Sequence, residues 1–296
     1  MWKNRCFNAQ VCYRVGMSPS LTDPASLKAL LAAQGIAPRR SASQNFLISQ
    51  PVIAAIVAAA CQGPKQVTEL GAGVGVITLA LLQADLSVRA IERDQQLAEI
   101  LAQATAEQVE RLEVIMADLR EVLWHWDTPY QIIGNIPYQL SGLILRRITQ
   151  LTPAPEQAIL LMQREVGQRL VAAGGQMQLL ALARQLWGEA EILRKVPAGS
   201  FWPAPAVDSC LVRLTPYPQE LLPLAERERV LAIAAHFFRE RRKQMGGVLR
   251  RWQGIPTEKA GKILNDASIA STARPQEVTA AQWIRFSRAG KMLYSS

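Results

Sequence analysis

The sequence predicts an α/β protein, with a parallel sheet covered by helices on both faces and a small all-helical C-terminal domain. Two observations carry this prediction. Between residues 66 and 162, short apolar segments alternate with amphipathic helical segments, which is typical of parallel strands joined by helices. Beyond residue 216 the strand signal disappears and only helical periodicities remain.

The individual elements follow from apolar periodicity and from the glycines and prolines that interrupt it. Apolar residues recur with a helical period in residues 25–34 and 51–61, and glycines follow both segments. Strands are predicted at 66–70, 87–92, 112–116, 131–134 and 158–162, and further helices at 75–83, 94–105, 141–150, 224–239, 257–265 and 280–289. Ligands of parallel sheets bind beyond the carboxyl ends of the strands, so we expect chemistry at the ends of the first four strands.

Three parts are expected along the chain of 296 residues. Residues 1–24 have no helical or strand period, and are interpreted as a disordered tail or as sequence before a true start at Met17. Residues 25–216 form the α/β domain and residues 217–296 the helical domain, with a boundary near Pro216–Pro218. Apolar residues make up 49% of the chain, which suffices for a sizeable core and argues against a disordered protein.

The net charge of +9 is unevenly distributed, with +5 in residues 1–40, −3 in residues 41–199 and +7 in residues 200–296. The two basic ends would attract a polyanion such as RNA or DNA, and a solvated basic surface explains the same distribution equally well. No apolar stretch approaches the roughly 18–20 residues that span a bilayer. The four cysteines are scattered without metal-binding spacing. We therefore expect no membrane span, no metal and no disulfide framework, and a monomer in the reducing cytoplasm.

The segment Glu69–Gly75, at the end of the first strand, contains glycines at 71, 73 and 75. Glycine permits positive φ and lets the backbone approach a ligand closely. The spacing matches neither the dinucleotide-binding fingerprint nor the P-loop. An acidic residue before Gly-x-Gly-x-Gly is typical of class I methyltransferases around S-adenosylmethionine. A tight strand-to-helix turn is the structural alternative.

Two carboxylates end the next two strands. Glu92 lies about 20 residues beyond the glycines, where an acid can accept both ribose hydroxyls of an adenosine. Asp118 can accept a hydrogen bond from the adenine amino group, or it can cap the following turn. For Glu92 the alternative is an ordinary exposed residue at a strand end.

The fourth strand runs into Asn135-Ile136-Pro137-Tyr138, which suits methylation of an exocyclic amine of a base. The Asn135 amide oxygen and the backbone carbonyl of Ile136 or Pro137 can each accept one N–H, which directs the nitrogen lone pair at a methyl donor. Proline makes the loop rigid, and the Tyr138 ring can stack on a base turned out of its helix. A β-to-α turn with a buried tyrosine is the alternative.

Taken in order, these motifs resemble those of the KsgA/RsmA ribosomal RNA adenine dimethyltransferases. The similarity covers about residues 27–290 and includes Gln44–Leu47, Gln163–Leu170, Ser200–Ser209 and Arg241–Lys243. It implies a Rossmann-like class I S-adenosylmethionine-dependent methyltransferase domain with a small helical C-terminal domain. It also implies dimethylation of N6 of two adjacent adenosines in the hairpin loop near the 3′ end of 16S rRNA, late in small-subunit assembly.

The resemblance further implies the site residues. The catalytic set is Asn135, Ile136, Pro137, Tyr138 and Phe201, with Phe201 and Tyr138 enclosing the target adenine. The S-adenosylmethionine-binding set is Asn45, Leu47, Gly71, Gly73, Glu92, Asp118 and Asn135. The sequence departs from the family pattern at Ser43, where glycine is common, at Ala72, where proline is common, and at Gln244–Gly247.

Arg241, Arg242 and Lys243 belong to a dense basic group that we expect to contact rRNA phosphates, with a solvated helix surface as the alternative. Arg146 and Arg147 are interpreted as ordinary surface charges of a helix.

Two other functions remain open. An Erm-type dimethylase of large-subunit rRNA shares Asn-Ile-Pro-Tyr. A non-catalytic RNA-binding assembly factor or organellar transcription factor of the same descent could lack the cofactor acids, which this chain retains.

Overall fold

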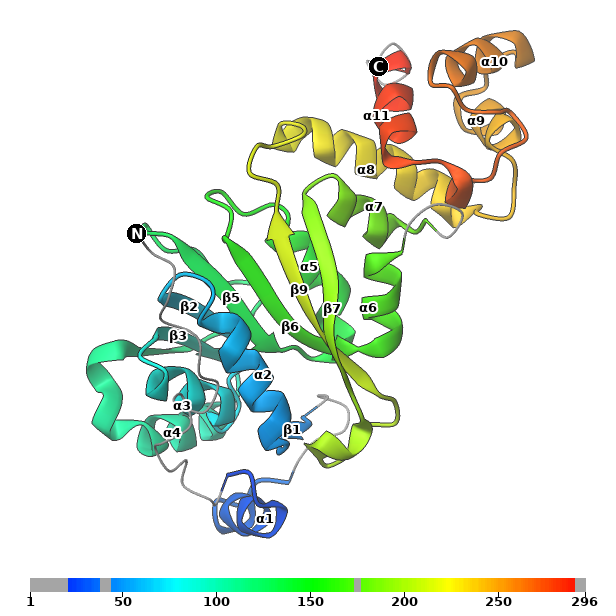
Figure 1. The fold of residues 1–296 in the computed structure, drawn as a ribbon. Coiled ribbons are helices and arrows are strands. Elements are labelled where there is room, and N and C mark those ends of the chain that lie inside the picture. Colours follow the sequence, from blue (N-terminus) through cyan, green and yellow to red (C-terminus); the bar gives the residue numbers. More distant parts are fainter. Residues whose placement is uncertain (1–20, 38–43, 173–176, 291–296) are drawn as a thin grey trace. The chain divides into compact units, whose positions relative to one another are not determined.

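The computed structural model describes residues 21–37, 44–172 and 177–290, which belong to two compact units (Figure 1). The first unit contains the chain up to Gly167 together with Glu191–Thr215, and the second contains Gln168–Ala190 and the chain from Pro216 onward. Residues 168–190, which the sequence analysis assigned to the α/β domain, group with the helical unit because helix α7 (Leu179–Gln185) packs against helix α8 (Leu224–Arg239). The predicted division into two domains at residue 216 stays a prediction.

Residues 21–24, which the sequence analysis placed in the N-terminal extension, are part of the fold, and residues 1–20 lie outside the described part of the chain. Leu21 is buried in the core of the first unit. Asp23 caps helix α1 (Pro24–Ala33) by accepting the Ser26 N–H at 2.8 Å. Asp followed by Pro is a strong helix start, so the fold begins before residue 25.

A seven-stranded sheet in the order β4-β3-β2-β5-β6-β9-β7 forms the centre of the first unit. Five of its strands are parallel: β2 (Gln66–Leu70), β3 (Ser87–Glu92), β4 (Leu112–Met116), β5 (Tyr130–Asn135) and β6 (Gln157–Gln163). Strand β9 (Ser209–Pro216) pairs antiparallel with β6, and β7 (Gly188–Val196) lies at the edge. The predicted parallel sheet is confirmed for the strands of residues 66–163, and β9 adds an antiparallel strand that the sequence analysis did not predict. The sequence analysis missed β7 because four charged residues interrupt its apolar pattern.

Helices cover both faces of this sheet. Strands β5 and β6 are buried along nearly their whole length, which requires protein on either side. Figure 1 shows α2 (Gln50–Ala60) in front of the sheet and α5 (Ser141–Ile148) behind it. The other helices that follow strands are α3 (Val76–Gln83), α4 (Gln95–Ala104) and α6 (Arg164–Val171). The predicted helices and strands of residues 25–163 are confirmed to within two residues at each end.

The order of the strands reverses between β2 and β5. From β2 the chain adds β3 and β4 on one side, and it then returns to add β5 and β6 on the other. Leu70, the last residue of β2, pairs in register with Gly134 of β5. The loops that leave these two strands are therefore neighbours, at the position where open α/β sheets bind their ligands.

The second unit is helical, and an aromatic cluster fills its core. Besides α7 and α8 it contains α9 (Met245–Gln253), α10 (Thr257–Asp266) and α11 (Ala280–Ala289). Phe237 makes edge contacts to the rings of Trp252, Trp283 and Phe286 at centroid distances of 5.6, 5.6 and 5.4 Å. Helix α9 was not predicted, because its two glycines at 246 and 247 weaken the helical signal. Within the described ranges, no helix has the length and hydropathy needed to cross a bilayer.

Candidate active site

A cavity of about 650 Å³ opens where the strand order reverses, and its volume suits a small-molecule ligand. Its walls come from strand β1 (Phe46–Leu47) and from the ends of β2, β3, β4 and β5. All of the residues expected to bind the cofactor line it: Asn45, Leu47, Gly71, Gly73, Glu92, Asp118 and Asn135. Residues from five separate segments thus converge on one space.

The glycine loop after β2 has a backbone shape that other residues adopt only with strain. Gly71 and Gly73 have φ values of +73° and +57°. The loop is anchored to β3, since the Gly71 N–H donates to the Ile91 carbonyl at 2.9 Å. A Cβ on Gly73 would lie 3.5 Å from the Phe46 ring, in the space between the loop and β1. The glycines therefore allow the bend of the loop, and they leave the space between the loop and β1 free of a side chain.

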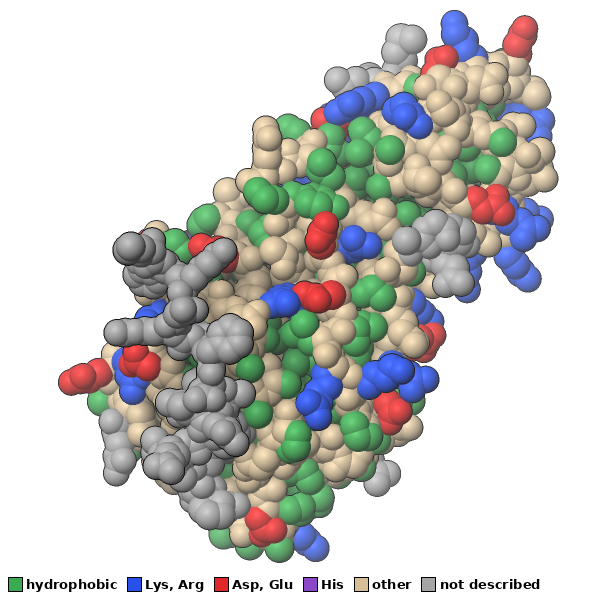
Figure 2. All heavy atoms as spheres, viewed as in Figure 1, with side chains coloured by type: hydrophobic (Ala, Val, Ile, Leu, Met, Phe, Trp, Pro, Cys, Tyr) green, Lys and Arg blue, Asp and Glu red, His purple; other side chains and the backbone are tan. Residues whose placement is uncertain are grey.

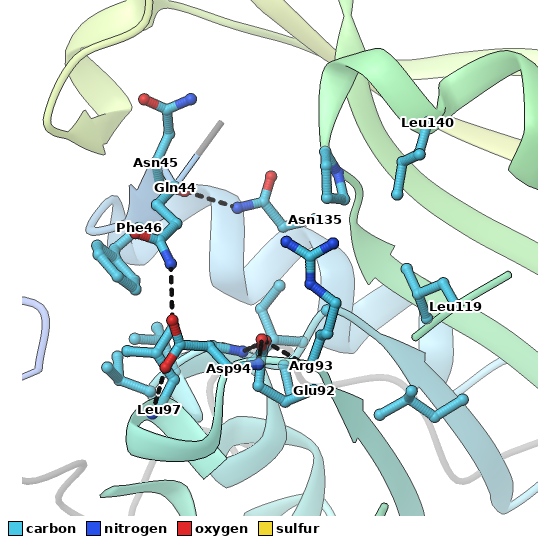
Figure 3. A pocket seen from close by; sticks show the side chains of 18 of the residues that line it. Gln44, Asn45, Phe46, Glu92, Arg93, Asp94, Leu97, Leu119, Asn135 and Leu140 are labelled. Carbon is cyan, nitrogen blue, oxygen red and sulfur yellow. Dashed lines mark hydrogen bonds between the residues drawn. The ribbon is translucent and has the colours of Figure 1, made fainter. Parts of the chain in front are cut away.

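Glu92 joins the glycine loop to the start of α4. Its Oε2 accepts the Gly73 N–H at 2.8 Å, and its Oε1 accepts the N–H groups of Arg93 and Asp94 at 2.8 and 2.9 Å. Burial raises the pKa of the Glu92 carboxyl, and the three backbone donors oppose that rise. The carboxylate is thereby held in one orientation at the cavity wall (Figure 3).

Asp118 is bound by two arginines. Arg120 donates to both of its oxygens, at 2.9 and 2.7 Å, and Arg93 approaches Oδ2 at 3.4 Å. The hydrogen bonds from Arg120 hold the pKa of Asp118 well below its usual range, so the group is a carboxylate at neutral pH. Asp118 can therefore accept a hydrogen bond from an amino group at this end of the cavity, although the guanidinium groups of Arg120 and Arg93 already bind both of its oxygens.

The loop after β5 lies beside the glycine loop, as the strand order predicted. A Cβ on Gly71 would lie 3.7 Å from the Asn135 carbonyl oxygen and 3.9 Å from Cδ of Pro137. The Asn135 side chain donates through Nδ2 to the Asn45 carbonyl at 2.9 Å. Figure 3 shows this bond, which turns the acceptor atom Oδ1 away from Asn45.

Three of the residues predicted to be catalytic do not line the cavity. The Ile136 side chain is buried, which leaves its backbone for the role considered above. The half-buried Tyr138 shares a hydrogen bond of 2.7 Å with the Ser209 hydroxyl, and burial raises its pKa. Phe201 is only 2% exposed and packs in the core.

Phe201 nevertheless lies next to the cofactor-binding segment in space. It belongs to β8 (Phe201–Trp202), which pairs antiparallel with β1 so that Leu47 faces Phe201. The Ile48 N–H donates to the Ser200 carbonyl at 2.9 Å. Two stretches of the family resemblance that are 150 residues apart are thus joined in one small sheet.

Sequence reasoning missed three charged residues of the cavity: Arg93, Asp94 and Arg120. Asp94 caps α4 and lies 3.4 Å from the Gln44 amide, which links β3 to the segment before β1. Each of the three residues follows within two positions of Glu92 or Asp118. Proximity to a predicted strand-end acid was the signal that could have identified them.

The basic residues Arg241, Arg242 and Lys243 are exposed and lie in the turn between α8 and α9 rather than on a helix. Neighbouring charges are paired: Arg251 of α9 donates to Glu240 at 2.7 Å. On the face shown in Figure 2, Lys and Arg side chains are interspersed with acidic ones rather than gathered in one continuous patch.

The polar groups and the backbone shape of the cavity fit S-adenosylmethionine. Carboxylates at the ends of β3 and β4 match the hydroxyl and amino groups of an adenosine, and the glycine loop allows close approach of the backbone. Within the described part of the chain, no three His, Cys, Asp or Glu side chains gather in a metal-binding cluster.

A sheet with this strand order, glycine loop and pair of strand-end acids defines a class I S-adenosylmethionine-dependent methyltransferase. The sequence model of the ribosomal RNA adenine dimethylase family matches residues 36–289. The chain belongs to the ribosomal RNA adenine dimethylase family.

Relatives and solved structures agree with this assignment. Two proteins named ribosomal RNA small subunit methyltransferase A are similar over most of their length. The one from Deinococcus radiodurans is 34% identical over 88% of each chain, and the one from Thermobifida fusca is 33% identical over 90% of this chain and 94% of its own. The 23S rRNA methyltransferase ErmE is 27% identical with a TM-score of 0.65, covering 83% of this chain and 99% of its own. A dimethyladenosine transferase from Plasmodium falciparum shares the fold, with 20% identity, a TM-score of 0.72 and coverage of 83% and 98%.

Proposed function

We propose that this protein transfers methyl groups from S-adenosylmethionine to N6 of two adjacent adenosines in the hairpin loop near the 3′ end of 16S rRNA, late in small-subunit assembly. We further propose that it acts as a monomer in the cytoplasm. The names of the full-length relatives support small-subunit rRNA as the substrate. The observation that carries the proposal is that Gly71 and the Asn135–Pro137 loop lie close together and line one cavity.

The cofactor residues divide by chemistry. Glu92 would accept the ribose hydroxyls, because its carboxylate is fixed by three backbone donors at the cavity wall. Asp118 would accept the adenine amino group. Gly71, Gly73, Asn45 and Leu47 would contact the cofactor through backbone and apolar surface. These acids also argue against a non-catalytic RNA-binding factor.

When bound, S-adenosylmethionine supplies an electrophilic methyl group on a sulfonium. The chain itself has to orient the target amine, whose lone pair is delocalised into the purine ring. Asn135 Oδ1 and the carbonyl of Ile136 or Pro137 would each accept one N–H of that amine, which favours a tetrahedral nitrogen. The bond from Asn135 Nδ2 to Asn45 supports this role, because it fixes which amide atom remains to accept.

The target base is proposed to stack on Tyr138. The hydrogen bond from Tyr138 to Ser209 holds the ring at the start of β9. A role for Phe201 in enclosing the base requires movement of β8, since its ring is packed in the core. The residues after β8, Ala204 and Ala206–Asp208, are exposed. Arg241, Arg242 and Lys243 would contact rRNA phosphates.

The competing function is dimethylation of large-subunit rRNA, and the similarity to ErmE is the observation that supports it. The two are separated by incubating the purified protein with labelled S-adenosylmethionine and either immature small subunits or 23S rRNA, followed by mass spectrometry of the nucleosides. We expect N6,N6-dimethyladenosine only in the small-subunit RNA. Dimethyladenosine in 23S rRNA, or none in either, would overturn the proposal.

The same assay tests the role of Asn135. Asn135→Ala removes the amide acceptor and the bond to Asn45 while leaving the buried strand β5 intact, so the protein should fold and bind cofactor. We expect methyl transfer to fall by at least about a hundredfold, the order of effect of losing one preorganised transition-state contact. Near-normal dimethylation by this variant would contradict the role of Asn135.

A further inference from the structure

Arg147 is not the ordinary surface charge that the sequence analysis took it to be. Its side chain is half-buried, whereas its neighbour Arg146 is exposed. From helix α5, Arg147 donates through Nη1 to the Leu119 carbonyl and through Nη2 to the Val122 carbonyl, the latter at 2.8 Å. Its guanidinium also lies over the ring of Trp124, 4.3 Å from the centroid. One side chain thus holds three residues of the segment that follows β4.

This segment, residues 118–124, forms one wall of the cofactor cavity. Asp118, Leu119 and Arg120 all line the cavity. The end of the segment is anchored to β2, because Trp124 is fully buried and its carbonyl accepts the Thr68 hydroxyl at 2.8 Å. Between Asp118 and Trp124, Arg147 of α5 binds the carbonyls of Leu119 and Val122, and through them α5 supports the wall of the cavity.

The same helix α5 follows directly on the loop that holds Asn135–Tyr138. Arg147 therefore connects the element behind the reacting loop to the wall that holds Asp118. A guanidinium suits this task, since its rigid fork reaches two carbonyls at once while its plane stacks on an aromatic ring. An ammonium on a flexible stem meets only part of that geometry.

We propose that Arg147 is a positioning residue for the adenine end of the cofactor site, acting through the backbone of Leu119 and Val122 to fix the place of Asp118. This role rests on the proposed binding of S-adenosylmethionine. Arg147 touches neither substrate nor cofactor in this account. Its removal lets the wall relax, and the hydrogen bond between Asp118 and the adenine amino group weakens.

The chain offers a matched control in Arg89. Arg89 on β3 donates to the His125 carbonyl at 3.0 Å and lies over the ring of Trp126, 4.4 Å from the centroid. It thus makes the same kinds of contact with the continuation of the same segment, and it also pairs with Glu113 at 2.7 Å. His125 and Trp126, however, do not line the cavity. Arg89→Gln should destabilise the protein in a similar way without affecting the wall.

The experiment is calorimetric titration of S-adenosylhomocysteine, which carries the same adenosine, into wild type, Arg147→Gln, Arg147→Lys and Arg89→Gln. We expect Arg147→Gln to weaken binding about tenfold, the value of one hydrogen bond, with partial rescue in Arg147→Lys and no change in Arg89→Gln. In steady-state assays the KM for S-adenosylmethionine should rise by the same factor, while kcat changes less than about twofold. Should Arg147→Gln fail to fold, Arg147→Lys takes its place, with a loss of affinity in the same direction but smaller than about tenfold, against no change in Arg89→Gln.

A double-mutant cycle with Asp118→Asn makes the test specific. If Arg147 acts through Asp118, Arg147→Gln should weaken binding little further once Asp118 has lost its charge. Equal losses in the Arg147 and Arg89 variants, unchanged affinity in Arg147→Gln, or strictly additive losses in the cycle would each overturn the inference. Failure of the wild type to bind S-adenosylhomocysteine would instead overturn the cofactor assignment, and this inference with it.

Discussion

Replacing Glu92 by glutamine changes one carboxylate oxygen to an amide NH2 and removes one charge from the cavity wall. The glutamine oxygen can keep the two bonds from Arg93 and Asp94. The amide NH2 then faces the Gly73 N–H, which in the wild type donates to Glu92 at 2.8 Å, so two donors confront each other. The variant therefore loses one charge-assisted hydrogen bond within the protein and one acceptor for the ribose.

The two losses differ in size. A hydrogen bond to a charged group contributes about 1.5–3 kcal/mol. For folding, burial raises the pKa of Glu92, so removal of the buried charge offsets part of this loss and the free energy of unfolding should fall by less than about 2 kcal/mol. For binding there is no such offset. Loss of the hydrogen bond to the ribose should cost about 2.7 kcal/mol of binding free energy, which corresponds to roughly a hundredfold weaker cofactor affinity.

The assay combines urea unfolding with calorimetric titration of S-adenosylhomocysteine for wild type and Glu92→Gln. We expect a modest shift of the unfolding midpoint and a large loss of affinity. If the variant bound the ligand within threefold of wild type, the assignment of Glu92 to the ribose would be refuted. If the free energy of unfolding fell by more than the free energy of ligand binding, Glu92 would be primarily a structural residue of the glycine loop.

Two further predictions concern a buried acid and the basic turn. Burial raises the pKa of Glu69 to about 8 from its ordinary 4.5, so its contribution to folding is complete below pH 4.5 and is lost as the pH rises through 8, by at most about 5 kcal/mol. Glu69→Gln retains an acceptor for the Thr78 hydroxyl and should flatten the fall in melting temperature between pH 5.5 and 9, whereas parallel profiles would contradict the raised pKa. Neutralising the basic residues 241–243 should reduce the slope of log RNA affinity against log salt by up to about 2, at roughly 0.7 per phosphate contact. The exposed lysines of α10, Lys259 and Lys262, provide the control, and an equal effect there would indicate a non-specific charge effect.

The sequence by itself determined the α-helices and strands between residues 50 and 163 and seven of the residues that line the cofactor cavity. Strand β6 is buried on both faces, so its sequence contains a continuous apolar run, Ala158–Met162, that stands out without any knowledge of the fold. The glycines after β2, Glu92 at the end of β3 and Asp118 shortly after β4 are local signals as well, because each lies within a few residues of the end of its strand. Parallel strands then bring their carboxyl ends together, and this is why a local pattern predicted a common site.

Only the tertiary structure decided which side chains support that site and which are withdrawn from it. Strand β9 exists as a strand because it pairs with β6, and β8 because it pairs with β1 across 150 residues of chain. The burial of Phe201 and the burial of Arg147 against Trp124 likewise depend on contacts between segments far apart in sequence. Periodicity and local spacing contain no information about such contacts, since they are set by packing rather than by the residues next to them in the chain.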